Sequence, residues 1–164
     1  MKLSPLYYTE NKKIKSFKLF LVFFFVMITG FSFSQVLGSP LIKNYSPKEY
    51  DFHPQNWAIV KDKRGILYFG NTNGILEFDG TNWRKIHVEN NYMIRSLAID
   101  NYGTIYVGAT GAFGFLAPDS LGNMQYNSIS DKCDTNIIKA VPDIWRIGIL
   151  NNEVYFNALN LIYK

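Results

Sequence analysis

A pattern of turn and strand residues recurs in this chain at a fixed spacing of 38 residues. The segment that begins at Trp57 and the segment that begins at Arg95 share five residues in the same order and at the same offset. The pairs are Asp62 and Asp100, Gly65 and Gly103, Tyr68 and Tyr106, Gly70 and Gly108, and Thr72 and Thr110. A constant period of this size is typical of a repeat architecture. We therefore expect function on the loops between repeats rather than at a motif inside one.

Each unit is a series of short segments, rich in β-branched and aromatic residues, that turn residues separate. The predicted strands are Trp57–Lys61, Ile66–Gly70, Ile75–Phe78, Trp83–Val88, Ile94–Ile99, Thr104–Gly108, Phe113–Ala117, Met124–Ile129, Ile144–Leu150, Glu153–Asn157 and Leu161–Lys164. No segment shows sustained helical periodicity. Four short antiparallel strands in about 40 residues are typical of a β-propeller blade, although a β-sandwich or another meander has similar strand spacing. The in-register recurrence favours the propeller.

We therefore predict an all-β fold: a partial β-propeller of about two and a half four-stranded blades over residues 57–164. The blades are expected at about 57–90, 92–130 and 143–164. Closed propellers have about four to eight blades. The ring thus needs completion by the rest of the same polypeptide or by a partner chain. The last strand stops at Lys164, which favours a truncated larger protein.

In the first two units, the turn between the first and second strands contains an aspartate. Asp62 and Asp100 stand at equivalent turns and could be interpreted as paired acids or calcium ligands. Hydrogen bonding of an aspartate to its own backbone explains both without a metal, and the glycine three positions later permits a positive φ. Asp79, before Gly80 in a hairpin signal, has the same explanation. We expect no metal and no cofactor.

The N-terminal residues have the composition of an export signal. A lysine-rich stretch precedes an apolar run from Leu19 to Ile28, and Ser32 and Ser34 place small residues at the −3 and −1 positions of a cut after Ser34. We predict a signal peptide over residues 1–34, with a retained N-terminal anchor as the alternative. The protein is then exported, to the periplasm or the extracytoplasmic face of the inner membrane. The membrane is contacted only through this leader or a missing downstream helix.

Removal of the leader changes the net charge of the protein. The first 34 residues carry five lysines and one glutamate, a net charge of +4, which equals the net charge of the whole chain. Residues 35–164 are therefore neutral. Nucleic-acid binding needs a basic face on the folded domain, so we expect no nucleic-acid partner for this region.

Residues 35–56 form a predicted lead-in segment. They contain three prolines, which argue against regular structure. The aromatic residues Tyr45, Tyr50 and Phe52 need apolar surface to cover, so we expect an extended segment that packs on the edge of the domain. Further on, the three tryptophans are expected to fill the space between blades; they are Trp57, Trp83 and Trp145.

Residues suited to catalysis are scarce. The sequence contains no GxxxxGK[ST], HExxH, GxSxG or CxxC motif. Its two histidines are His53, expected to be structural or exposed, and His87, expected to be packed or hydrogen-bonded on a strand. Cys133 is the single cysteine and cannot form an internal disulfide. We predict a small residue in a loop there, with a reactive or intermolecular thiol as the alternative, and no catalytic residues.

The first unit resembles the two-component regulator propeller repeat. The matching residues are Asp62, Gly65, Tyr68, Gly70, Gly74, Asp79, Gly80 and Trp83. The second unit departs from the repeat at Ala112 and at Pro118-Asp119, and the third keeps Trp145, Tyr155 and Phe156 but lacks the Asp-x-x-Gly turn. The resemblance spans roughly residues 40–164. It implies the N-terminal part of an exported sensor region, which a membrane helix and a kinase, phosphatase or DNA-binding output would follow.

Blade geometry suggests where a ligand would bind. Two kinds of loop open on the same face of a propeller: those that join the second and third strands of a blade, and those that join a fourth strand to the next blade. On this chain they contain side chains that can hydrogen-bond and stack on a polar ligand such as a glycan. The candidate residues are Asn71, Asn73, Asn90, Asn91, Tyr92 and Thr110. The leading hypothesis is a non-catalytic, extracytoplasmic ligand-sensing module of a signal-transduction regulator. An exported interaction or adhesion scaffold is the alternative, and a propeller glycoside hydrolase or lyase fragment is a third.

Overall fold

The structure is a computed structural model that describes residues 6–29, 38, 41–133 and 140–164. They belong to two separate units, Met1–Lys43 and Asn44–Lys164. The first unit contains helix α1 (Leu6–Thr29), although no helical periodicity predicts it, because the apolar run Leu19–Ile28 within it has no polar face. By length and hydropathy, neither helix of the described chain qualifies as a membrane span. The predicted cleavage point after Ser34 lies outside the described residues.

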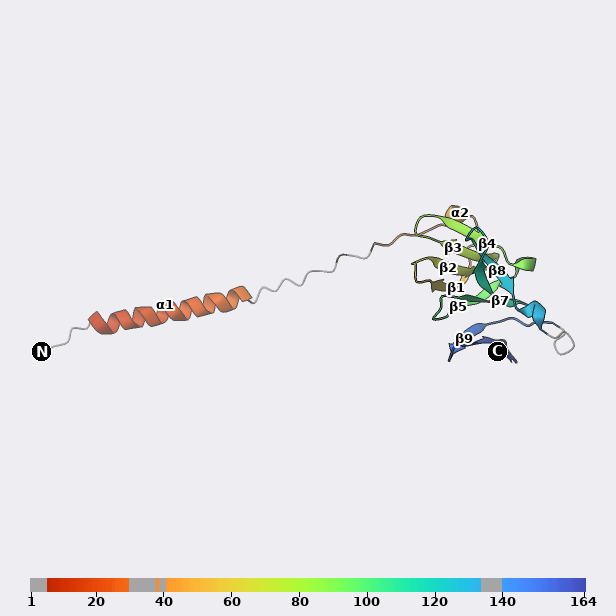
Figure 1. The fold of residues 1–164 in the computed structure, drawn as a ribbon. Helices are drawn as coiled ribbons and strands as arrows, with labels where there is room; N and C mark the ends of the chain where they lie inside the picture. The colour runs from red at the N-terminus through yellow and green to blue at the C-terminus, as the bar shows by residue number, and fades with distance from the viewer. Residues whose placement is uncertain (1–5, 30–37, 39–40, 134–139) are drawn as a thin grey trace. The chain divides into compact units, whose positions relative to one another are not determined.

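The second unit is a partial β-propeller, as the strand pattern predicts (Figure 1). Its strands form three consecutive antiparallel sheets of four, four and three strands, each in sequence order. The first sheet comprises β1 (Asn56–Lys61), β2 (Leu67–Asn71), β3 (Gly74–Phe78) and β4 (Trp83–Ile86). The second comprises β5 (Ile94–Ile99), β6 (Ile105–Ala109), β7 (Phe113–Pro118) and β8 (Met124–Ser128). The third comprises β9 (Arg146–Leu150), β10 (Glu153–Asn157) and β11 (Ile162–Tyr163).

The first two sheets repeat each other at the predicted offset. Ala58 pairs with Gly70 between β1 and β2, and Ser96 pairs with Gly108 between β5 and β6. The segments Ile66–Gly70 and Thr104–Gly108 are therefore structurally equivalent, as expected. Strand ends differ from the predicted ones by one or two residues, because hydrogen-bond ladders rather than composition set them.

The turns before β2 and β6 are built on the two repeated aspartates. Asp62 Oδ1 accepts the backbone N–H groups of Arg64 at 2.9 Å and of Ile66 at 3.0 Å. Asp100 Oδ1 accepts those of Tyr102 at 2.9 Å and of Thr104 at 2.8 Å. The turn role predicted for both acids is confirmed. The glycine in each turn has a left-handed φ, 91° in the first and 95° in the second, which a residue without a Cβ adopts at low cost.

Two apolar clusters between successive sheets hold the unit together. The first joins blade one to blade two and includes the fully buried Tyr68, Ile75 and Ile94. The second joins blade two to blade three around Phe113 and Phe156. Burial of such side chains removes apolar area from water at about 25 cal/mol per Å² and is the main force that stacks the blades.

The lead-in segment departs from the expected irregular structure, since residues Pro47–Tyr50 form the short helix α2. Pro47 occupies the start of the helix, where proline is favoured because its missing N–H would be unpaired in any case. The Tyr45 and Tyr50 rings pack on Trp83, with centroids 5.4 Å and 5.2 Å away. The lead-in aromatics thus cover the outer part of the face of blade one that points away from blade two.

Candidate functional site

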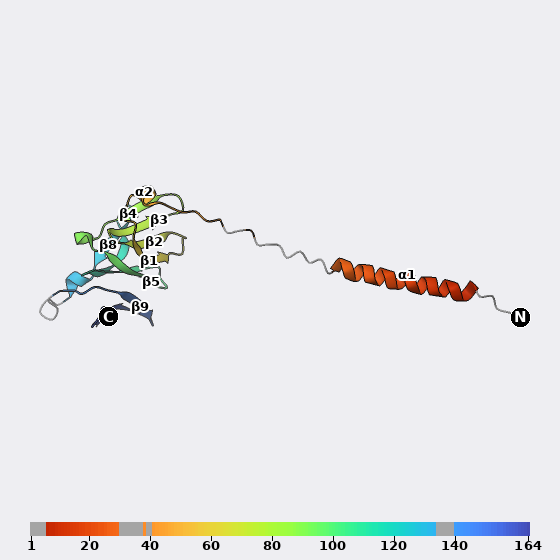
Figure 2. The same cartoon turned by 180° about the vertical axis from the view of Figure 1, so that it is seen from behind.

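The first strands of the three sheets follow one another, with β1 in contact with β5 and β5 in contact with β9 (Figures 1 and 2). The ladder is interrupted near the start of two of them. A β-bulge lies between Asn56 and Ala58 in β1, and an equivalent one lies between Ile94 and Ser96 in β5. A bulge leaves one residue unpaired and re-aims its side chain. The residues at these two points are Trp57 and Arg95.

The third strand of this series places a tryptophan next to them. Trp145 directly precedes β9, and its backbone N–H donates to Asn157 O at 2.9 Å. The guanidinium carbon of Arg95 lies 4.1 Å from the centroid of the Trp145 ring and 5.4 Å from that of Trp57. These distances are those of cation–π contacts. The three residues are named the Trp–Arg–Trp row below.

The row combines exposed aromatic surface with a mostly covered cation. Trp57 is 42% exposed and Trp145 is 49% exposed, whereas the Arg95 side chain is 17% exposed. The expectation that all three tryptophans fill the space between blades is therefore wrong for Trp57 and Trp145. Trp83 packs in an aromatic cluster with Phe69 and Phe78, but this cluster lies on the face of blade one that points away from blade two. The difference arises because the bulge re-aims Trp57 and because Trp145 precedes its strand.

Arg95 also makes an ion pair. Its Nε–H donates to Asp143 Oδ2 at 3.0 Å, and the Asp143 side chain is 37% exposed. Asp143 belongs to the segment that leads into β9, so the pair connects blade two to the entrance of blade three. The contact holds the guanidinium plane against Trp145.

The turns that follow β2 and β6 lie beside the row. Thr72 accepts the indole N–H of Trp57 at 3.3 Å, and its own backbone N–H donates to Gln55 O at 3.3 Å. Thr110 occupies the equivalent place one blade later, where its N–H donates to Met93 O at 2.9 Å and its hydroxyl accepts the Met93 N–H at 3.1 Å. The row and the predicted binding loops therefore share one face of the propeller.

Two of the predicted candidates lie at the end of β2 and in the turn that follows it, and they have different roles. Asn71 is fully buried, and its side-chain amide donates to His53 O at 2.6 Å and to Asn56 Oδ1 at 2.7 Å. These bonds tie the lead-in to blade one. Asn73 is exposed, and its backbone N–H donates to Asn71 Oδ1 at 3.0 Å. Asn71 therefore shapes the turn, while Asn73 offers its side chain to solvent.

The other candidates lie between blades one and two. Asn90 and Asn91 have left-handed φ values of 57° and 51°. The Asn90 amide donates to the Tyr92 hydroxyl at 3.2 Å, and the Tyr92 ring packs partly against the first core cluster. The structure thus groups Asn90, Tyr92 and Thr110 around the entrance to β5. A binding role for all six candidates stays a prediction.

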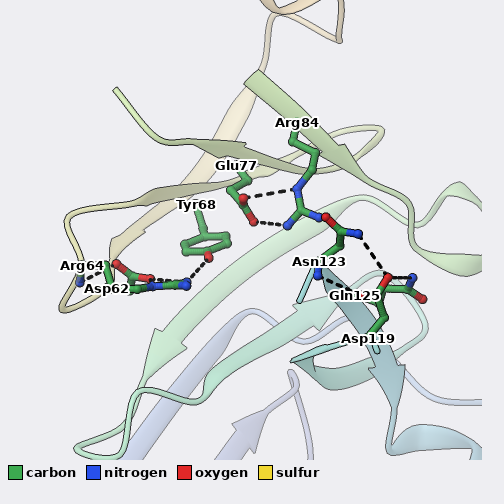
Figure 3. A network of polar contacts seen from close by, with 8 residues as sticks. All are labelled: Asp62, Arg64, Tyr68, Glu77, Arg84, Asp119, Asn123 and Gln125. Atoms are coloured by element: carbon green, nitrogen blue, oxygen red, sulfur yellow. Dashed lines mark hydrogen bonds and ion pairs between the residues drawn. The ribbon is translucent and has the colours of Figure 1, made fainter. Parts of the chain in front are cut away.

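The other marked polar region lies between β4 and β8, at the outer edges of the two blades, beside a cavity of about 590 Å³ (Figure 3). Arg84 Nε donates to one oxygen of Glu77 at 3.2 Å. Asp119 accepts the side-chain amides of Gln125 at 3.0 Å and Asn123 at 3.4 Å. Hydrogen bonds, the backbone N–H of Asn123 foremost, hold the pKa of Asp119 below its ordinary value. The polar groups of this cavity largely satisfy one another.

Tyr68 belongs to a separate set of polar contacts in the same view (Figure 3). Arg64 donates to Asp62 Oδ2 at 2.9 Å and to the Tyr68 hydroxyl at 3.2 Å. Burial, and next the negative charge of Glu77, raise the pKa of Tyr68 to about 12. The phenol therefore stays neutral and works as a structural link between the Asp62 turn and the core.

Two further residues singled out in the sequence have packing or loop positions. Cys133 is a free thiol, partly buried against the second core cluster. His87 follows the end of β4 and is exposed at the edge of the cavity between β4 and β8, so the expectation of a packed histidine on a strand is wrong. In the described ranges, no group of three or more His, Cys, Asp or Glu side chains is placed to hold a metal ion.

Comparison with known proteins reveals similarity to solved structures. No protein-family model matches the chain, and no curated protein sequence matches it. Among solved structures, the chain is similar to the extracellular domain of a putative one-component system from B. thetaiotaomicron, with 16% sequence identity and a TM-score of 0.44. The match covers 77% of this chain and 23% of that structure. The chain thus spans about a quarter of the length of the protein that it resembles.

Proposed function

We propose that this propeller is the exported, non-catalytic sensing module of a signal-transduction regulator and binds a small polar ligand, such as a glycan, on the face that carries the Trp–Arg–Trp row. The observation that carries the proposal is the exposure of Trp57 and Trp145 on either side of Arg95. The resemblance of the first unit to the two-component regulator propeller repeat supports the signalling context.

The energetics of the row favour binding. An aromatic side chain buries 150–250 Å² when it is fully covered. Leaving nearly half of an indole in water therefore forgoes roughly 2–3 kcal/mol for each tryptophan. A flat apolar ligand face laid on these rings would recover part of this energy. The indole N–H and the guanidinium would supply directional hydrogen bonds.

The row also stands on rigid elements, as a binding site requires. Its residues lie near the starts of the first strands of three packed sheets. The bulges that present Trp57 and Arg95 are fixed by the flanking ladder pairs. The acid beside the tryptophans, Asp143, is bound to Arg95. A glycoside hydrolase would need a pair of carboxylates across the scissile bond, so the arrangement supports recognition without hydrolysis.

An exported interaction scaffold is the second candidate, and one observation favours it. The face of blade one that points away from blade two carries Ile59, which is 59% exposed, beside Trp57 and Phe69. The equivalent residues of blade two, Leu97 and Val107, pack against blade one. Another blade, from the rest of the same polypeptide or from a partner chain, would cover this apolar surface.

A binding screen tests the sensing role. The full chain is applied to a glycan array, and hits are titrated by tryptophan fluorescence. We expect saturable binding that Trp57→Ala and Trp145→Ala each weaken by about tenfold or more, which is the loss of roughly one well-packed aromatic contact. Tyr102→Ala is the matched control, because Tyr102 is an aromatic residue, 79% exposed, in the turn at the other end of the strands.

Two results would contradict the sensing role. One is the absence of any saturable small-molecule ligand, which would favour the scaffold. The other is binding that both tryptophan substitutions leave unchanged while circular dichroism shows folded protein. Sequencing the coding region beyond position 164 tests the regulator: a membrane helix and an output region are expected, and a stop codon soon after the ring closes would contradict it.

A further inference from the structure

We infer that the ligand of the Trp–Arg–Trp row is an acidic sugar, and that Arg95 recognises its carboxylate while the two indoles stack on the sugar ring. This inference rests on the proposed binding function of this face. It adds the chemical class of the ligand and assigns specificity to Arg95 and Asp143.

The first step is the identity of the residue at the centre of the row. Trp57 and Arg95 stand at equivalent bulges, so blade two has a guanidinium where blade one has an indole. An arginine whose side chain is 17% exposed has lost much of its hydration. Packing alone would be served better by a third aromatic residue. Asp143 pairs with the Nε–H of this cation, and the remaining donors are accounted for if they bind a second charged group.

The second step is the geometry of the guanidinium. The group has five N–H donors in one plane, and its two terminal nitrogens form the fork that matches a carboxylate. Asp143 accepts the Nε–H, and it is the hydrogen-bond acceptor of Arg95 among the described residues. The ion pair therefore occupies the Nε–H of the guanidinium, and the two terminal nitrogens remain to bind a second anion.

The third step is the combination with the indoles. One face of a pyranose ring consists of C–H groups and stacks on an aromatic face, whereas the carboxylate of a uronic acid projects from the rim of the ring. Trp57 and Trp145 are 42% and 49% exposed, and each ring lies beside the Arg95 guanidinium, so their exposed aromatic surface adjoins this group. Ring and carboxylate can thus be engaged together, and a neutral sugar would use only the indoles.

Asp143 sets the selectivity in this arrangement. Its single hydrogen bond to Nε orients the guanidinium, but its negative charge repels an incoming carboxylate. Replacing Asp143 with asparagine keeps an oxygen that can accept the Nε–H and removes the repulsion. An acidic ligand should then bind more tightly, which is the opposite of what the loss of a purely structural ion pair would cause.

The test compares trigalacturonic acid with its fully methyl-esterified form, which has the same rings without the charges, by tryptophan fluorescence titration of the full chain. We expect the acid to bind about tenfold more tightly than the ester. Arg95→Gln should reduce the affinity for the acid to that for the ester and leave the ester unchanged. Asp143→Asn should raise the affinity for the acid about threefold or more. Arg146→Gln removes a neighbouring exposed arginine and should change neither affinity.

Three results would overturn the inference. Equal affinities for acid and ester, both lost in Trp57→Ala, would retain the binding face and reject acid recognition. Equal weakening of both probes by Arg95→Gln would assign Arg95 a structural role. No binding of either probe would reject the acidic class, while the glycan array decides the proposed function separately.

Discussion

Asp62 and Asp100 occupy the same turn in successive blades, and each carboxylate accepts the backbone N–H of the residue four positions ahead. The distances are 3.0 Å to Ile66 N and 2.8 Å to Thr104 N. Each carboxylate is also linked to the tyrosine six positions ahead. Tyr106 donates directly to Asp100 Oδ2 at 3.2 Å, whereas Arg64 bridges Asp62 to Tyr68. The repeated aspartate therefore stabilises both its turn and the following strand.

Removing one of these carboxylates should destabilise the propeller. Asp100→Ala leaves two backbone N–H groups and the Tyr106 hydroxyl without their acceptor, so we expect a loss of about 1–3 kcal/mol in the free energy of unfolding. Asp100→Asn keeps one acceptor oxygen and should cost less. Urea denaturation followed by circular dichroism measures both. Asp131→Ala, at an exposed position, should stay within about 0.5 kcal/mol of the parent.

Acid should unfold the protein through the same residues. Burial works to raise the pKa of Asp62, but hydrogen bonds from the Arg64 side chain and the Ile66 backbone outweigh it and lower this pKa from 3.8. A carboxyl whose pKa is lower in the folded state stabilises the fold above the unfolded pKa and loses this contribution as the pH falls through the folded one. The urea midpoint should therefore be constant from pH 7 to about 5 and decline below pH 4. An Asp62→Asn, Asp100→Asn variant with the same decline would contradict this assignment.

Alkali should act through Tyr68. The pKa of this fully buried phenol rises from 10.0 to about 12 on folding, chiefly because of burial. The unfolded chain thus ionises first, and stability present below pH 10 is lost as the pH rises toward 12, by about 3 kcal/mol in total. The Tyr68→Phe variant has no phenol to ionise at this position. Its free energy of unfolding should therefore decline less between pH 9 and pH 11 than that of the parent protein. Parallel declines in the two proteins would refute the prediction.

Two glycines at equivalent positions, Gly70 in β2 and Gly108 in β6, test how closely the blades approach. A Cβ at Gly108 would lie 2.3 Å from Ser96 Oγ and 2.6 Å from Ile144 Cγ2, whereas a Cβ at Gly70 would lie 2.9 Å from Ile94 Cγ2. Such overlap costs typically about 1–3 kcal/mol. We expect Gly108→Ala to be the more destabilising of the two in thermal denaturation.

Gly148 provides the control for these substitutions. Nothing lies within 4 Å of a Cβ built there, so Gly148→Ala should leave the melting temperature unchanged or raise it slightly. If Gly108→Ala were as mild as Gly148→Ala, the contact between blades two and three would be looser than the structure shows.

The sequence predicted part of the candidate site. The loops that contain Asn73, Tyr92 and Thr110 do lie on the face that carries the Trp–Arg–Trp row, because their place in the repeat determines the side on which they open. Arg95 was missed. The available signal was its alignment with Trp57 at the 38-residue offset, where a charged residue replaces an aromatic one.

The order of the strands within each blade and the aspartate turns follow from the sequence alone, because hairpins and turns depend on residues a few positions apart. The repeat unit follows from the recurrence at 38 residues. The register bulges, the short helix α2 and the meeting of Trp57, Arg95 and Trp145 were decided only by the tertiary structure. Trp57 and Arg95 are 38 positions apart in the sequence, and Arg95 and Trp145 are 50 positions apart. Their contact requires three packed sheets. Local patterns predict which residues form a strand, but the packing of one blade on the next determines which side chains remain exposed.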